Sequence, residues 1–243
     1  MLTRRAFMAG AAALAPTFSA RWAWAQDPDL PREPATKPGR YKLNLERDRD
    51  GLFYLPAGYK PETPMPLMVV LHGAGGSSES AVGAFPLADE LGFIVLATDA
   101  KDWTWDSIIG AFGPDVEFLQ RAFVSVMQRC SVDKARLALT GFSDGASYAL
   151  SLGIGNGDVF TSIIAGSPGV MQPATVAGKP RIFISHGTAD NVMPIDDTSR
   201  KFVPRLRALG YDVTYREYEG RHTWPPEIRR EAYVWWVEGS KKK

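Results

Sequence analysis

The chain has 243 residues, of which 45% are hydrophobic and 23% charged, so it can form one domain with a sizeable core, and disorder is excluded as its main state. The formal net charge of +1 becomes −2 without residues 1–25, because that segment holds three of the 28 basic groups and none of the 27 acidic ones. Lysines 241–243 are interpreted as a solvated tail. This balance indicates no nucleic-acid partner.

Residues 1–25 have the pattern of a secretory signal: a basic start, an apolar run over 6–18 and small residues up to Ala25. The adjacent Arg4 and Arg5 resemble a twin-arginine export signal. An uncleaved membrane anchor is the alternative, but the run is shorter than the ~20 residues that a spanning helix needs. We therefore expect cleavage after Ala25 and a periplasmic or secreted protein with no stable membrane anchor after processing.

Residues 26–39 carry prolines at about every third position, which favours an extended linker, and the domain is predicted to span 40–240. Short β-rich runs predict eight strands within it. The predicted strands are 41–45, 52–55, 67–71, 93–98, 136–140, 162–165, 181–185 and 213–218.

Helical patterns alternate with these strands, at 115–130, 143–152, 198–209 and 226–236. The alternation predicts an α/β fold with a mostly parallel eight-stranded sheet, helices on both faces and an antiparallel hairpin of the first two strands. Only 167–180 separates the sixth and seventh strands, which leaves no room for a large cap domain. The one cysteine, Cys130, ends an amphipathic run and is interpreted as a structural or bystander thiol.

The motif with the most chemical content is Gly141-Phe142-Ser143-Asp144-Gly145, which lies between a predicted strand and a predicted helix. In that context G-x-S-x-G indicates a nucleophilic serine in a strained turn, because the flanking glycines let neighbouring backbone pass closely. The alternative is a glycine-rich turn that binds an anion. We expect Ser143 to be the nucleophile.

A serine hydroxyl needs a base to take its proton, and the chain has three histidines. His222 follows the last predicted strand and comes after both the serine and an acid-bearing loop, which is the order of this kind of triad. His222 is therefore the predicted general base. His72 and His186, each at a strand end beside a glycine, are predicted to fix loops by hydrogen bonds to backbone near the site.

Asp190 is the predicted acid of the triad, because it lies just beyond the end of the strand at 181–185. Asp196 and Asp197 are rivals. They adjoin Thr198 and are better interpreted as acids at the start of a helix.

An oxyanion hole needs backbone N–H groups aimed at the developing charge. One is expected from Asp144, and the second from the glycine-rich loop after the third strand, with Ala74 favoured and Gly75 next. That loop lacks the G-K-[ST] ending of a phosphate-binding loop, and no G-x-G-x-x-G follows a first strand. We expect neither a cofactor nor a metal.

Together these motifs resemble the α/β-hydrolase superfamily, and in particular its phospholipase/carboxylesterase, dienelactone hydrolase and polyhydroxybutyrate-depolymerase or feruloyl-esterase-like groups. The resemblance covers about 52–237. It implies an exported serine carboxylesterase that works through an acyl-enzyme on small-molecule or oligomeric esters, with short-acyl or aryl esters and polyester oligomers as the expected classes.

Trp103-Thr104-Trp105 is similar to a Trp-x-Trp element of the depolymerase- and feruloyl-esterase-like members. Trp103, Trp105 and Trp224 are therefore expected to edge an open site; packing in the core is the alternative, because tryptophan buries a large area wherever it lies. The same triad also serves acyl transfer and peptide hydrolysis. A non-catalytic binding protein on a hydrolase scaffold is the alternative from a different class.

Overall fold

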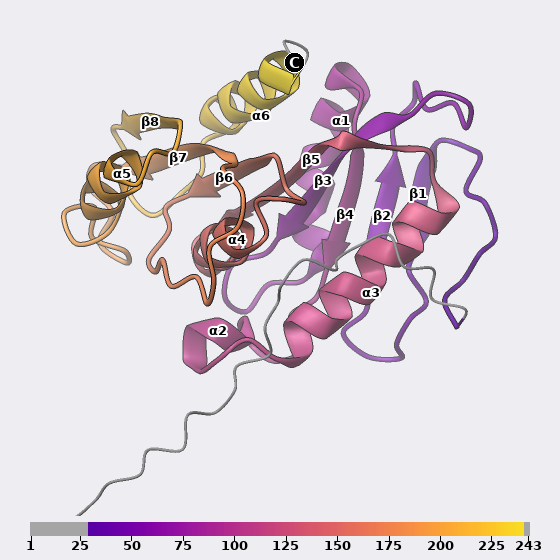
Figure 1. Cartoon of the computed structure of the whole chain (residues 1–243), viewed down its shortest axis with the longest axis horizontal. Coiled ribbons are helices and arrows are strands. Elements are labelled where there is room, and N and C mark those ends of the chain that lie inside the picture. The colour runs from indigo at the N-terminus through magenta and orange to yellow at the C-terminus, as the bar shows by residue number, and fades with distance from the viewer. Residues whose placement is uncertain (1–28, 241–243) are drawn as a thin grey trace, which may run out of the picture.

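The computed structural model describes residues 29–240, which form one sheet between two layers of helices (Figure 1). The leader expected at 1–25 lies outside the described residues. The sheet has the eight strands that the sequence predicts. They are β1 (Gly39–Lys42), β2 (Gly51–Leu55), β3 (Met65–Leu71), β4 (Ile94–Thr98), β5 (Val132–Phe142), β6 (Ser162–Gly166), β7 (Arg181–Gly187) and β8 (Val213–Tyr218).

The strand order is β1-β2-β4-β3-β5-β6-β7-β8. The β1–β2 hairpin and the β2–β4 pair are antiparallel, and all pairs from β4 to β8 are parallel. The predicted antiparallel edge and mostly parallel sheet are thus confirmed. Because parallel strands end at the same edge, the loops after β3, β4, β5, β7 and β8 gather there, and these loops carry the predicted site residues.

Helices cover both faces of the sheet (Figure 1). One layer holds α3 (Pro114–Arg129), α4 (Asp144–Gly155) and α5 (Ser199–Ala208), and the other holds η1 (Ser78–Ala84), α1 (Phe85–Leu91) and α6 (Pro226–Ser240). The short α2 (Asp106–Ile109) contacts α4. The sequence did not identify η1, α1 or α2, since a helix of one or two turns shows little periodicity.

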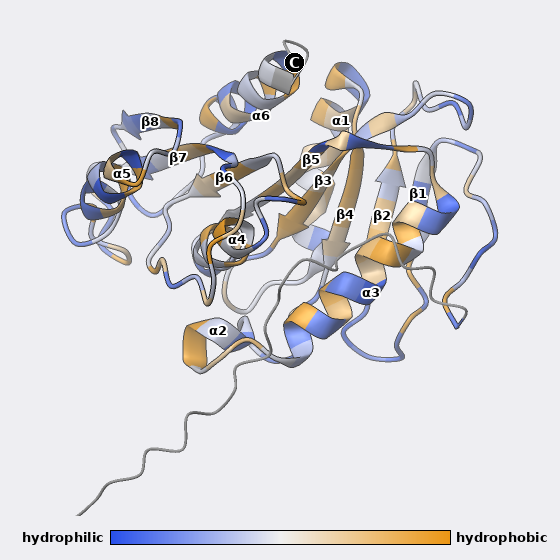
Figure 2. Cartoon of the chain, in the orientation of Figure 1, coloured by the Kyte–Doolittle hydropathy of each residue, from blue (hydrophilic) through white to orange (hydrophobic). Residues whose placement is uncertain are grey.

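Side chains alternate between two cores, one on each face of the sheet. Along β3, Leu67 and Val69 belong to the core under α3 and α4, whereas Met68 belongs to the core under α1 and α6. Burial of each such side chain contributes about 1.5–3 kcal/mol. Figure 2 shows apolar central strands and an α3 in which apolar and polar residues alternate. Val116 and Phe123 of α3 are buried in the core that this helix shares with the sheet.

The segment 29–38, within the predicted linker, forms no helix or strand. Leu30 and Ala35 are nevertheless buried, and the Ala35 N–H donates to the carbonyl of Arg129 at 2.9 Å. This segment therefore packs on the end of α3 ahead of β1.

Cys130 follows α3 and is buried, and burial raises the pKa of its thiol to about 12. This is the environment of a structural thiol. The stretch 167–180 between β6 and β7 forms no helix, in agreement with the predicted lack of a large cap domain. Within residues 29–240 no helix combines the length and apolarity needed to cross a membrane.

Candidate active site

Ser143 lies at the sharp turn between β5 and α4. Its backbone has φ 58° and ψ −122°, a strained conformation for a residue with a side chain. The turn is held by a hydrogen bond from the Ser143 N–H to the carbonyl of Gly166 at 2.9 Å. A Cβ on Gly145 would lie 2.2 Å from the Leu71 carbonyl oxygen, so only glycine lets α4 start this close to β3.

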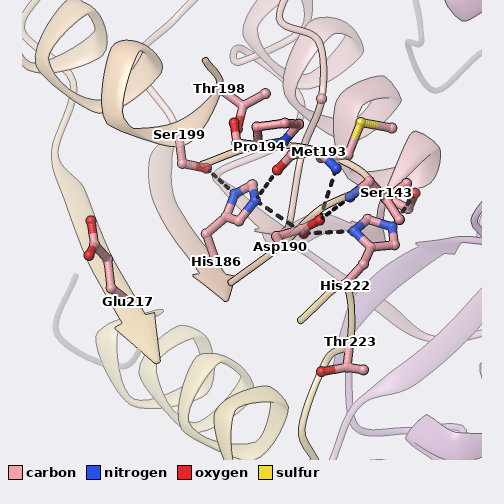
Figure 3. A network of polar contacts seen from close by, with 12 residues as sticks. Ser143, His186, Asp190, Met193, Pro194, Thr198, Ser199, Glu217, His222 and Thr223 are labelled. Atoms are coloured by element: carbon pink, nitrogen blue, oxygen red, sulfur yellow. Dashed lines mark hydrogen bonds and ion pairs between the residues drawn. The ribbon is translucent and has the colours of Figure 1, made fainter. Parts of the chain in front are cut away.

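Three side chains that are far apart in the sequence form a continuous hydrogen-bonded chain (Figure 3). Nδ1 of His222 lies 2.7 Å from Oδ2 of Asp190, and Nε2 lies 2.9 Å from Oγ of Ser143. Because a carboxylate only accepts, Nδ1 carries the proton and Nε2 accepts from the Ser143 hydroxyl. This arrangement can move the hydroxyl proton to the imidazole and leave a reactive oxygen.

The side chain of Asp190 is completely buried, and every oxygen of its carboxylate has a donor. Oδ1 accepts from the N–H groups of Val192 at 2.9 Å and Met193 at 2.8 Å. Burial by itself raises the pKa of Asp190, but the hydrogen bonds from His222, Met193 and Val192 bring this pKa below its usual value. The carboxylate is therefore ionised at neutral pH.

The rival acids do not reach this network. Asp196 and Asp197 are exposed at the start of α5, where they form ion pairs with Arg200 and Lys201. Neither is a hydrogen-bond partner of His222, whose Nδ1 is engaged by Asp190.

His186, at the end of β7, also touches the Asp190 carboxylate (Figure 3). Its Nε2 lies 2.8 Å from the carbonyl oxygen of Met193 and 3.2 Å from Oδ2 of Asp190. Both neighbours only accept, so Nε2 carries the proton, and Nδ1 accepts from the Ser199 hydroxyl at 2.7 Å. The predicted backbone contact is confirmed, but the sequence did not reveal the contact with the acid. The only sequence signal was the His-Gly-x-x-Asp spacing.

His72 fixes the loop after β3, as predicted. Its Nδ1 donates to the carbonyl of Gly73 at 2.7 Å, and its Nε2 accepts from the Ala100 N–H at 2.9 Å. Gly73 in turn lies against the nucleophile, since a Cβ on it would be 3.5 Å from Cβ of Ser143. His72 thereby ties the end of β3 to the chain after β4, beside the serine.

Of the three candidate N–H groups for the two expected donors of an oxyanion hole, two have no acceptor among the described residues. Across residues 29–240 no protein group accepts a hydrogen bond from the N–H of Ala74 or of Asp144. The expectation for Gly75 is corrected: its N–H donates to the carbonyl of Trp103 at 2.7 Å and is not available to an oxyanion. Gly75 adopts φ +69°, a left-handed conformation that favours glycine at this turn of the loop.

Residues 103–105 connect three parts of the site. Besides the bond from Gly75 to Trp103, the Thr104 hydroxyl donates to the buried carboxylate of Asp144 at 2.6 Å, and the Trp105 indole donates to the carbonyl of His72 at 2.8 Å. The Thr104 contact gave no signal in the sequence, where only the tryptophans stood out.

The three tryptophans have different environments. Trp103 is 64% exposed with its indole next to Gly75. The expectation that Trp105 edges the site is corrected. This side chain is 1% exposed, and its ring stacks on that of Tyr148 with 4.9 Å between centroids, so it packs in the core. Trp224 is half-buried and lines a pocket of ≈ 200 Å³ beside the serine turn, together with Phe142. Within residues 29–240 no His, Cys, Asp and Glu side chains cluster as a metal site would require.

No protein-family model matches the chain. It is 25% identical over 174 residues to the probable feruloyl esterase C of Aspergillus oryzae, a match covering 68% of this chain and 62% of that protein. It is 26% identical over 181 residues to the feruloyl esterase C of Emericella nidulans, covering 71% of this chain and 65% of that protein. The chain thus spans less than two thirds of the length of these relatives.

Solved structures with a similar fold include esterase PE8, with a TM-score of 0.61 and 21% identity over 79% of this chain and 99% of that one. Another is a CE1 ferulic acid esterase from Anaeromyces mucronatus in complex with ferulic acid, with a TM-score of 0.63 and 17% identity over 86% of this chain and 92% of that one. These likenesses and the sheet order confirm the predicted α/β-hydrolase fold.

The two buried histidines predict how stability depends on pH. Burial lowers the pKa of both His72 and His186 in the folded chain. As pH falls, the unfolded chain binds protons before the folded chain does. The contribution of these two histidines to stability is therefore fully present above the ordinary histidine pKa of about 6.5, and it is lost as pH falls through their lower pKa values in the folded chain. We expect a lower Tm at pH 5.5 than at pH 7.5 by calorimetry, and a smaller decrease when His186→Gln and His72→Gln are combined. An equal decrease in the double variant would contradict this assignment.

Proposed function

We propose that this chain, which has the α/β-hydrolase fold, is a serine carboxylesterase that cleaves esters through an acyl-enzyme intermediate. The observation that carries the proposal is the hydrogen-bonded chain Ser143–His222–Asp190 at a strained strand-to-helix turn. The free N–H groups of Ala74 and Asp144 beside it, and the names of the relatives, add support.

In the proposed mechanism, Oγ of Ser143 attacks the ester carbonyl carbon while Nε2 of His222 takes the hydroxyl proton. The negative charge that forms on the carbonyl oxygen is stabilised by the N–H groups of Ala74 and Asp144. His222 then gives its proton to the leaving alcohol as the ester C–O bond breaks. A water molecule, deprotonated by His222, hydrolyses the acyl-serine and restores the hydroxyl.

Asp190 has a supporting part in this mechanism. Its ionised carboxylate holds Nδ1–H of His222, so that Nε2 is the atom available as a base, and it stabilises the imidazolium that forms during attack. Because Asp190 is itself held by two backbone N–H groups, the imidazole is aimed at Ser143 before substrate arrives.

The proposed substrates are short-acyl or aryl esters, and oligomers of polyesters. No helical insertion lies between β6 and β7 to sequester a long acyl chain. The adjoining pocket is small, at ≈ 200 Å³, and the rings of Phe142 and Trp224 line it, which suits an aromatic or short acyl group. The feruloyl esterase relatives point to the same chemical class.

The first test is of the nucleophile. A fluorophosphonate probe should label the native protein at Ser143, and Ser143→Ala should lose labelling and lower kcat for p-nitrophenyl acetate by at least about 10⁴-fold with an unchanged Tm. His222→Ala should lose nearly as much, since triad members act as a unit. Absence of labelling in the native protein would favour a non-catalytic binding protein. Labelling with acyl transfer to added alcohols or with amide cleavage, but without ester hydrolysis, would favour an acyltransferase or a peptidase.

The second test is of acyl length, by kcat/KM on p-nitrophenyl acetate, butyrate, octanoate and palmitate, and on methyl ferulate. A methylene left outside a pocket contributes none of the ~0.8 kcal/mol that burial gives, so activity should peak on the short and aryl esters. Trp103→Ala should raise KM for the ferulate more than for the acetate, whereas the distant, exposed Leu209→Ala should change neither. A steady rise toward palmitate would show a buried acyl tunnel and overturn the proposed substrate class.

We also propose that residues 1–25 are a twin-arginine-type signal, so that the mature enzyme is periplasmic or secreted. The support is the sequence pattern around Arg4 and Arg5. Full-length protein should be found outside the cytoplasm with an N-terminus near Gln26. The double variant Arg4→Lys with Arg5→Lys should retain it inside, and export of that variant at the native level would refute the twin-arginine route.

A further inference from the structure

The pocket of ≈ 200 Å³ lies between the serine turn and the layer formed by η1 and α6. Gly73 lines it and also lies against Ser143. Phe142 lines it too, and its ring is 4.8 Å from that of His222. The pocket is therefore close enough to Ser143 for one molecule to place its ester bond at the serine and another of its groups in the pocket.

Two polar groups of the residues that line this pocket are buried without a hydrogen-bond partner. They are Nε of Arg229, in the first turn of α6, and Nε1 of Trp224. Within residues 29–240 no carboxylate lies within ion-pair distance of Arg229, whereas the next residue, Arg230, pairs with Glu90 on α1. A guanidinium and an indole N–H only donate, so both orphaned groups require an acceptor.

The residues that line the pocket carry a positive charge and no negative one. Arg229 is its only permanently charged residue, and no Asp or Glu contributes to it. Tyr233 is fully buried, which raises the pKa of its phenol to about 12, and burial lowers the pKa of His72, so both are neutral at pH 7. Within residues 29–240 no carboxylate is therefore paired with this guanidinium.

We propose that this pocket binds a carboxylate carried by the ester substrate. The substrate is then a monoester of a dicarboxylic acid, or an ester whose alcohol part bears a carboxylate. The planar guanidinium matches a carboxylate, and a single cation among aromatic and alanine walls suits a monoanion better than a phosphate dianion. The proposal rests on the proposed esterase function and names a preference within it.

The test compares matched pairs of esters. On the acyl side, p-nitrophenyl half-esters of glutaric, adipic and pimelic acid are compared with the valerate, hexanoate and heptanoate, after subtraction of spontaneous hydrolysis. On the alcohol side, the butyrate of 4-hydroxybenzoate is compared with that of 4-hydroxybenzamide. We expect one charged series to exceed its neutral partners by about tenfold in kcat/KM, mainly through KM, because a hydrogen bond to a charged group is worth about that factor.

Arg229→Met should remove the preference while neutral esters keep their rate, and Arg229→Lys should restore part of it. Arg230→Met is the matched control: it makes the same charge change on the same helix, but Arg230 does not line the pocket, so the preference should remain. The proposal would be overturned, with the esterase function intact, if the ratio of kcat/KM for charged to neutral esters were the same in the two Met variants. Preference for the neutral esters in both series would overturn it too.

A binding measurement separates this proposal from the esterase function. Monoethyl adipate and monoethyl pimelate are titrated calorimetrically into Ser143→Ala protein, which cannot turn them over, with the diethyl esters as neutral controls. Binding of a half-ester that is lost with Arg229→Met added supports the carboxylate site even where no ester is hydrolysed. The butyrate of 4-hydroxybenzoate is titrated in the same way as the alcohol-side ligand. Binding that is unaffected by Arg229→Met, or no binding of any of the three charged esters, refutes the proposal.

Discussion

The candidate site depends on the burial of one negative charge, the carboxylate of Asp190. A buried ion costs several kcal/mol unless its oxygens are paired, so the groups around it must stay in place for the fold to be stable. They come from the loop after β7, from His186 at the end of β7 and from His222 after β8. The same bonds that stabilise the charge therefore also aim the imidazole at Ser143, which links the stability of the fold to the geometry of the proposed triad.

A second constraint is the close approach of α4 to β3. The glycine at 145 allows it, and the strained Ser143 turn exposes the hydroxyl beside Gly73. The backbone N–H groups of Ala74 and Asp144, on the two sides of this approach, have no acceptor within residues 29–240. The hydrogen bonds of Trp103, Thr104 and Trp105 hold these loops together, which is the preorganisation that the proposed oxyanion hole requires.

In the proposed esterase, the side chains around Ser143 determine what kind of ester can be placed there. The exposed Trp103 lies against the glycine-rich loop after β3, and the small aromatic pocket is lined by Arg229, whose Nε has no hydrogen-bond partner. Neither feature follows from the fold, which supports many activities. They come from single residues on α6 and the loops, which lie outside the strands of the sheet.

The sequence by itself determined the eight strands, the sheet type and the three residues that meet as Ser143, Asp190 and His222, because strand patterns, the G-x-S-x-G turn and the order of the loops are local signals. Only the tertiary structure decided which neighbours complete the site. The N–H of Gly75 donates to the carbonyl of Trp103, Trp105 packs in the core, and His186 contacts Asp190. These outcomes depend on which groups find partners across the fold, and hydrogen-bond satisfaction between distant residues leaves no periodic trace in a sequence.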